Sequence, residues 1–212
     1  MAKPPAAAPL SDPQIIDPNN ELAVDFFLEE NKGKILAAVV IALVALAAWA
    51  FFQYQQVQTG KEQSAAFFAA KAPDDWKALI VKYPGSLVAG HSQLLLADKL
   101  RDQNKLDEAL QVLGDFTKSG ATHPLIAQGW LSYAATLELK GETAKAQQAY
   151  ATIAAQYGTT DAAPAALSAQ ARLAKTAGDT KKARETYQDI VTRFPASMWA
   201  QEAQQQIGQL PN

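Results

Sequence analysis

The order of apolar and polar side chains divides the chain into three stretches. Residues 1–34 are mixed, with three lysines and six acids after a proline-rich start. Residues 35–52 form the apolar run ILAAVVIALVALAAWAFF, which holds no charge. From residue 53 onward, apolar side chains recur every three or four positions, which is the spacing of amphipathic helices. The pattern predicts an all-α protein in which a single transmembrane helix precedes a helical domain.

The apolar run is long enough to cross a bilayer core. Eighteen helical residues span about 27 Å, and the flanks extend this length. Trp49 at one end suits the headgroup region, and Lys32 and Lys34 at the other can snorkel to it. A buried core helix is the alternative, but such helices usually have shorter apolar runs. No small-x-small cleavage site follows the run, so we expect an uncleaved anchor.

The orientation of the anchor follows from the lysines beside it. Within ten residues the N-terminal flank carries Lys32 and Lys34, and the C-terminal flank carries only Lys61. Because positive flanks stay inside, we expect the N-terminus in the cytoplasm and the C-terminal domain on the other side.

A repeat of 37 residues organises the C-terminal part. A small residue followed seven positions later by Asn or Gly predicts a helix that packs closely and ends in a left-handed cap. A second Ala and then larger apolar residues follow, so each repeat reads as a helical hairpin. The columns in register are Ala97, Ala134 and Ala171; Asn104, Gly141 and Gly178; Ala109, Ala146 and Ala183; Leu113, Tyr150 and Tyr187; and Phe116, Ile153 and Ile190.

These hairpins resemble tetratricopeptide repeats, which predicts a TPR-like α-hairpin solenoid. The repeat is longer than the usual 34 residues, and Leu167 and Gln93 stand where the pattern places Trp. The residues expected to form the structural repeat core are Ala97, Ala109, Trp130, Ala134, Gly141, Ala146, Tyr150, Ala171, Gly178, Ala183, Tyr187 and Pro195.

The expected organisation has five parts. Pro73 predicts a break between a helix that continues from the membrane segment and a short helix up to Lys82. The parts are a largely disordered cytoplasmic tail at 1–34, with a short helix within 20–31, the transmembrane helix at 35–52, a connecting helix and degenerate first repeat at 53–86, three hairpins at 87–195, and a capping helix at 196–212.

Composition and motifs argue against catalysis. The chain has no cysteine, and its 19 basic and 21 acidic residues give a net charge of −2, which disfavours nucleic-acid binding. His91 and His123 are the only histidines and have no partner at metal-ligand spacing. We therefore expect a non-enzymatic protein with no catalytic residue, cofactor, metal or small-molecule substrate. An enzyme that uses groove carboxylates is the rival hypothesis.

The first helices of stacked hairpins usually line a concave surface that binds protein partners. In this chain that surface would combine mixed charges with two leucines, which suits a peptide or a partner helix. The residues predicted to line this partner-binding groove are Leu94, Asp98, Arg101, Leu131, Glu138, Arg172 and Lys175.

Three features together resemble the YfgM-type ancillary subunits of the bacterial Sec (SecYEG) translocon. They are the approach FFLEENKGK to the membrane helix, the helical repeats, and the final segment FPASMWAQEA. The resemblance implies a single-pass protein of the bacterial inner membrane whose periplasmic domain binds translocon subunits and a membrane-anchored chaperone, and so assists exported chains. A TPR scaffold of another inner-membrane complex, in envelope assembly or division, is the alternative.

Overall fold

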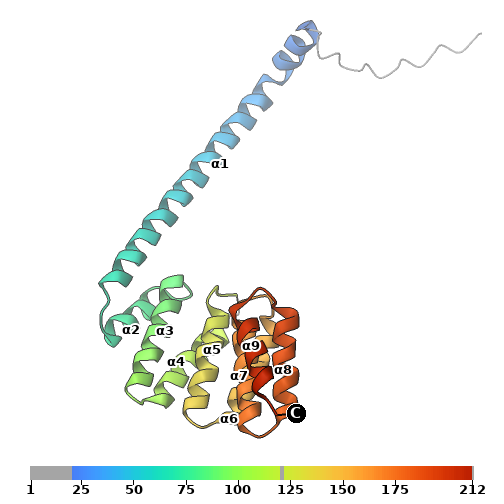
Figure 1. The fold of residues 1–212 in the computed structure, drawn as a ribbon. Helices are drawn as coiled ribbons and strands as arrows, with labels where there is room; N and C mark the ends of the chain where they lie inside the picture. Colours follow the sequence, from blue (N-terminus) through green and yellow to red (C-terminus); the bar gives the residue numbers. More distant parts are fainter. Residues whose placement is uncertain (1–20, 120–121, 212) are drawn as a thin grey trace, which may run out of the picture. The chain divides into compact units, whose positions relative to one another are not determined.

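The computed structural model describes residues 21–119 and 122–211, and within these ranges the chain is helical without a strand (Figure 1). This confirms the predicted all-α class. The helices are α1 (Glu21–Ala69), α2 (Pro73–Lys82), α3 (Leu87–Asp102), α4 (Leu106–Ser119), α5 (Ile126–Leu139), α6 (Thr143–Gln156), α7 (Ala162–Thr176), α8 (Thr180–Arg193) and α9 (Met198–Gln209).

The chain divides into two compact units, Met1–Thr59 and Gly60–Asn212. In the first unit, residues 36–52 are exposed along α1, and this helix is long and apolar enough to be a candidate membrane span. The expected disordered tail lies outside the described residues up to position 20, and its remainder, from Glu21, is helical. The apolar surface of α1 therefore has no cover within the described part of this unit.

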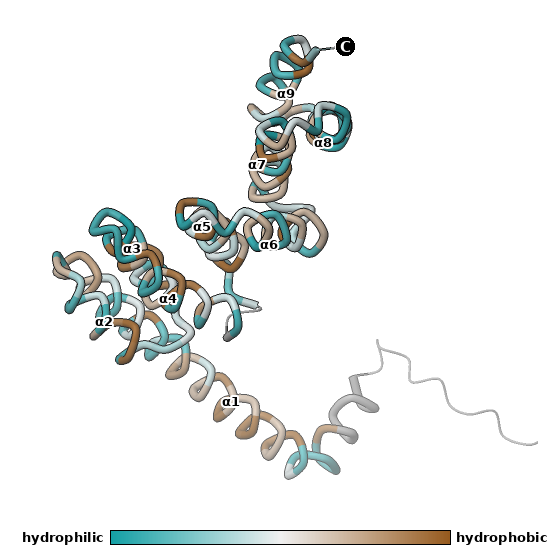
Figure 2. Tube along the Cα trace, turned by 90° about the horizontal axis from the view of Figure 1, so that it is seen from below, coloured by the Kyte–Doolittle hydropathy of each residue, from teal (hydrophilic) through white to brown (hydrophobic). Residues whose placement is uncertain are grey.

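The second unit is a row of antiparallel hairpins. Consecutive helices from α2 to α9 pack against each other, and Figure 2 shows α3/α4, α5/α6 and α7/α8 following one another, with α9 last. The helical structure is interrupted between α1 and α2. There, the Asp75 carboxylate accepts hydrogen bonds from the backbone N–H groups of Lys71 and Ala72 at 2.8 and 3.0 Å. Pro73 then begins α2, because proline lacks only an N–H that is unused at this position.

The three hairpin turns have the same geometry at intervals of 37 residues. Asn104, Gly141 and Gly178 adopt φ values of 59°, 82° and 81°. The next residue in each turn donates its N–H to a carbonyl five residues earlier, for example Lys105 to Leu100 at 2.8 Å. These are Schellman caps, in which a left-handed residue lets the chain reverse while satisfying helix-terminal carbonyls.

The core repeats with the same period. The small residues that join the paired helices, Ala97, Ala134 and Ala171 on first helices and Ala109, Ala146 and Ala183 on second helices, are all fully buried. Tyr150 and Tyr187 are also buried, whereas Trp130 is half-buried against Tyr133. Gly141, Gly178 and Pro195 are exposed, because they lie in turns or just after a helix.

Candidate partner-binding groove

One side of the hairpin row is formed by first helices that lie close together. Among the described residues, α3 contacts α5, α5 contacts α7, and α7 contacts α9, whereas the second helices α4, α6 and α8 do not contact one another. Crowded first helices and separated second helices make the first-helix side the inner side of the curve. The seven predicted groove residues lie on these helices: Leu94, Asp98 and Arg101 on α3, Leu131 and Glu138 on α5, and Arg172 and Lys175 on α7.

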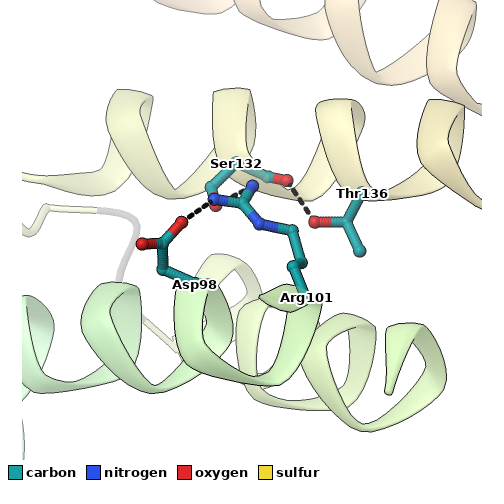
Figure 3. A network of polar contacts seen from close by, with 4 residues as sticks. All are labelled: Asp98, Arg101, Ser132 and Thr136. Atoms are coloured by element: carbon teal, nitrogen blue, oxygen red, sulfur yellow. Dashed lines mark hydrogen bonds and ion pairs between the residues drawn. The ribbon is translucent and has the colours of Figure 1, made fainter. Parts of the chain in front are cut away.

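Arg101 connects α3 to α5. Its guanidinium pairs with Asp98 one turn earlier and donates a 3.1 Å hydrogen bond to the Ser132 hydroxyl (Figure 3). The carbonyl of Ser132 accepts a 2.7 Å bond from the buried Thr136 hydroxyl. Asp98 is well exposed, whereas Arg101 is mostly covered, so the pair positions the guanidinium across the helix boundary.

Glu138 and Arg172 connect α5 to α7. The guanidinium donates to both carboxylate oxygens, at 2.7 and 2.8 Å, and the Tyr150 hydroxyl donates to Glu138 at 3.2 Å. Hydrogen bonds from Arg172 hold the pKa of Glu138 below its usual value, although partial burial opposes the shift. Burial, followed by the charge of Glu138, raises the pKa of Tyr150 to about 12. Glu138 therefore remains a carboxylate and Tyr150 a neutral donor at neutral pH.

Lys175 connects α7 to α9 through a 3.0 Å hydrogen bond from its ammonium to the Gln206 side chain. This contact repeats the Arg101–Ser132 contact two periods later, because both span 31 residues. Sequence reasoning missed Ser132 and Gln206, although the 37-residue period places them in one column. The predicted acids of the groove, Asp98 and Glu138, each bind an arginine and not each other.

Leucines supply the apolar part of the groove. Leu94 and Leu131 are half-buried against the clusters beneath them. Other apolar side chains on the first helices are more accessible, among them Leu95, 39% exposed on α3, and Leu139, 66% exposed at the end of α5. These two were not predicted, because neighbouring positions on one helix carry similar residues and only packing shows which is covered.

A pocket of 660 Å³ lies between α7 and α9. Arg172 and Lys175 line it from α7, Trp199 and Glu202 line it from α9, and Tyr187 contributes from α8. Helix α9, which forms one wall of the pocket, has Ser197 as its N-cap, and the Ser197 hydroxyl accepts a hydrogen bond from the Ala200 N–H. Sequence reasoning placed this helix as a cap and assigned it no binding residue.

The two histidines are apart from the groove's polar contacts. His123 is buried, with its Nε2 3.0 Å from the Ser86 carbonyl and its Nδ1 accepting from the Leu125 N–H, so it joins the starts of α3 and α5. His91 lies against the Phe67 ring. Within the described residues, no group of three His, Cys, Asp or Glu side chains is arranged to hold a metal ion.

The sequence matches two family models. Residues 26–128 match a tetratricopeptide repeat-like domain, and residues 165–197 match a tetratricopeptide repeat. No match is found among curated proteins.

Solved structures share the fold at low identity. MamA is 18% identical, with a TM-score of 0.50 over 65% of this chain and 73% of MamA. A tetratricopeptide repeat protein from Parabacteroides merdae ATCC 43184 is 21% identical, with a TM-score of 0.50 over 71% of this chain and 54% of its own. At such identities the likeness concerns the fold alone. The helical hairpins of this chain are tetratricopeptide-like repeats.

Proposed function

We propose that the protein is a non-enzymatic, membrane-tethered adaptor that binds protein partners through the groove formed by α3, α5, α7 and α9. The observation that carries the proposal is that charged and apolar side chains of these helices have different roles. Arg101, Glu138, Arg172 and Lys175 bond to side chains on neighbouring helices, while Leu95 and Leu139 on the same first helices remain exposed. Tetratricopeptide folds typically serve as protein-interaction scaffolds, which supports this function.

The membrane part of the proposal rests on α1. The exposed apolar side chains of residues 36–52 have no cover within the described residues, and a bilayer would cover them. In the proposed arrangement the N-terminus is cytoplasmic and the repeats are periplasmic. A tether confines the repeats near their partners and raises the effective concentration, so weak groove contacts suffice.

The resemblance to ancillary Sec translocon subunits leads to the finer proposal. The repeats would act at the periplasmic exit of the translocon and, together with a membrane-anchored chaperone, assist exported chains. A scaffold of another inner-membrane complex would have the same fold and tether, so the identity of the partner distinguishes the two.

In-cell photo-crosslinking tests the proposed surface. We expect a photoreactive residue at Leu94, Leu131 or Arg172 to crosslink to translocon subunits or periplasmic chaperones. Gln148 and Gln188 are exposed on second helices and serve as matched controls that should not crosslink. Equal crosslinking from both sets would contradict the groove, and crosslinks to a different membrane complex would favour the alternative scaffold.

Two further measurements test the tether. Protease added to spheroplasts should digest the repeats, and full protection would place them in the cytoplasm and remove the translocon-exit role. Replacing residues 35–52 with an unrelated membrane helix should preserve partner association. Complete loss would show that the helix itself recognises the partner.

A further inference from the structure

The pocket between α7 and α9 is hollow because small side chains form its α7 wall. Ala165, Ser168 and Ala169 line it, whereas the positions one period earlier, on α5, hold Gln128, Leu131 and Ser132. The truncated wall leaves 660 Å³, a volume within the usual range of binding pockets.

The charges in this pocket are incompletely paired. The charge of Arg172 is paired with Glu138, whose two oxygens accept from its guanidinium. Lys175 bonds to the neutral amide of Gln206, and within the described residues no carboxylate lies within ion-pair distance of it. Glu202 is exposed at the pocket wall and likewise forms no ion pair with any described residue. The pocket therefore presents one cation and one anion that have no oppositely charged partner among the described residues.

Comparison with the Arg101–Ser132 contact shows which group the Lys175–Gln206 contact lacks. Arg101 has an acid, Asp98, three residues before it, and its guanidinium donates to Ser132 on the next first helix. In the equivalent contact, Lys175 takes the place of Arg101 and Arg172 that of Asp98. The carboxylate that completes the first contact is thus absent from the last one, at the site where the pocket opens.

We propose that this pocket binds an extended segment of a protein partner that supplies an acidic side chain to Lys175, a basic side chain to Glu202 and an apolar side chain to Trp199. This inference rests on the proposed function and specifies its partner.

The register of α9 sets the order of these side chains. Trp199, Glu202 and Gln206 occupy one face of the helix, so successive sites lie about 4.5 and about 6 Å apart along its axis. In an extended segment, residues i, i+2 and i+4 point to one side at intervals of about 6.6 Å. The preferred pattern is therefore acid-x-base-x-apolar, in one or the other chain direction.

Peptide selection on the full chain in nanodiscs tests the inference. The probe is a displayed library of random 12-residue peptides with a linker at each end, so that no peptide has a free terminus. We expect acidic and basic residues two positions apart to be enriched about threefold each over the input, which is the effect of an exposed charge pair.

Charge reversal gives the decisive comparison. Lys175→Glu should replace the preference for an acid by one for a base, and Glu202→Lys should do the converse at the other position. Lys181→Glu changes the net charge equally from an exposed site on α8 and should leave the selected pattern as in the wild type. An unchanged pattern in Lys175→Glu and Glu202→Lys would overturn the inference.

A pairwise measurement confirms the contact itself. For one selected peptide, Asp→Asn should weaken binding to the wild type about threefold and should have no effect on binding to Lys175→Gln. Binding that requires a free carboxyl terminus would assign the site to chain ends and overturn the proposal.

The same selection separates this inference from the proposed function. Peptides that depend on Leu95 and Leu139, but not on Lys175 or Glu202, would leave the groove as the binding surface and refute the pocket. No enrichment over nanodiscs without protein would count against both.

Discussion

The substitution Gly129→Ala tests how closely α4 and α5 pack. Gly129 is buried in α5, and a Cβ atom added to it would lie 2.5 and 2.6 Å from two ring carbons of Phe116. Phe116 is 3% exposed and its ring packs at its edge against His123, with 5.1 Å between ring centroids, and both residues line a pocket of 300 Å³. Ala in a helix normally stabilises by about 1 kcal/mol relative to Gly, but overpacking costs about 1–3 kcal/mol or more.

We expect the overlap to dominate, so that Gly129→Ala lowers the free energy of unfolding by about 2 kcal/mol. For a unit of this size, the melting temperature should fall by about 4–8 °C. Thermal unfolding of the full chain in detergent, followed by circular dichroism, measures the change. Gly114→Ala, on the opposite helix of the same pair, is the matched control, because its Cβ would meet the Tyr133 ring at an ordinary 3.7 Å.

The control should stabilise the protein by up to about 1 kcal/mol through helix propensity alone. The pair of variants should therefore shift the melting temperature in opposite directions. A rise for Gly129→Ala similar to that for Gly114→Ala would refute the packing of Phe116 against α5.

Three other perturbations test the repeat and the groove. Ala146→Leu should destabilise the protein by about 1–3 kcal/mol, because this residue is fully buried between paired helices, and an unchanged melting temperature would contradict the repeat register. Gly141→Ala should cost about 1–2 kcal/mol in chemical denaturation, because the turn requires a φ of 82°; a neutral result would exclude this cap. The folded-state pKa of Glu138 lies below its ordinary value of 4.5, so its pairing with Arg172 stabilises the protein above that pH and the contribution is lost as the pH falls. Glu138→Gln should therefore lower stability at pH 7 by no more than about 1 kcal/mol and flatten its dependence on acid pH, whereas an unaltered acid profile would show that the pair contributes nothing.

Repetition made the local structure of this chain predictable. The spacing of Ala97, Ala134 and Ala171 required close helix contacts at one interval, and Asn104, Gly141 and Gly178 required left-handed caps seven residues later. Pro73 similarly predicted the start of α2. These features depend on residue size, backbone freedom and the missing proline N–H, which are properties of single residues and of their immediate neighbours.

The groove was predictable only as a set of helix faces. All seven proposed residues lie on first helices, because periodicity determines the face of a residue. Periodicity does not determine which side chain on the next hairpin a groove residue contacts. That Arg101 reaches Ser132 while Glu138 reaches Arg172 depends on how successive hairpins stack.

The amino-acid sequence by itself thus determined the helical class, the apolar segment, the repeat length and the turns. Tertiary structure alone decided which leucines remain exposed, how His123 joins two helix starts, and that a pocket opens between α7 and α9. The reason is physical: helix and turn preferences act over a few neighbouring residues, whereas exposure and pocket volume depend on side chains from helices about 30 residues apart in the sequence.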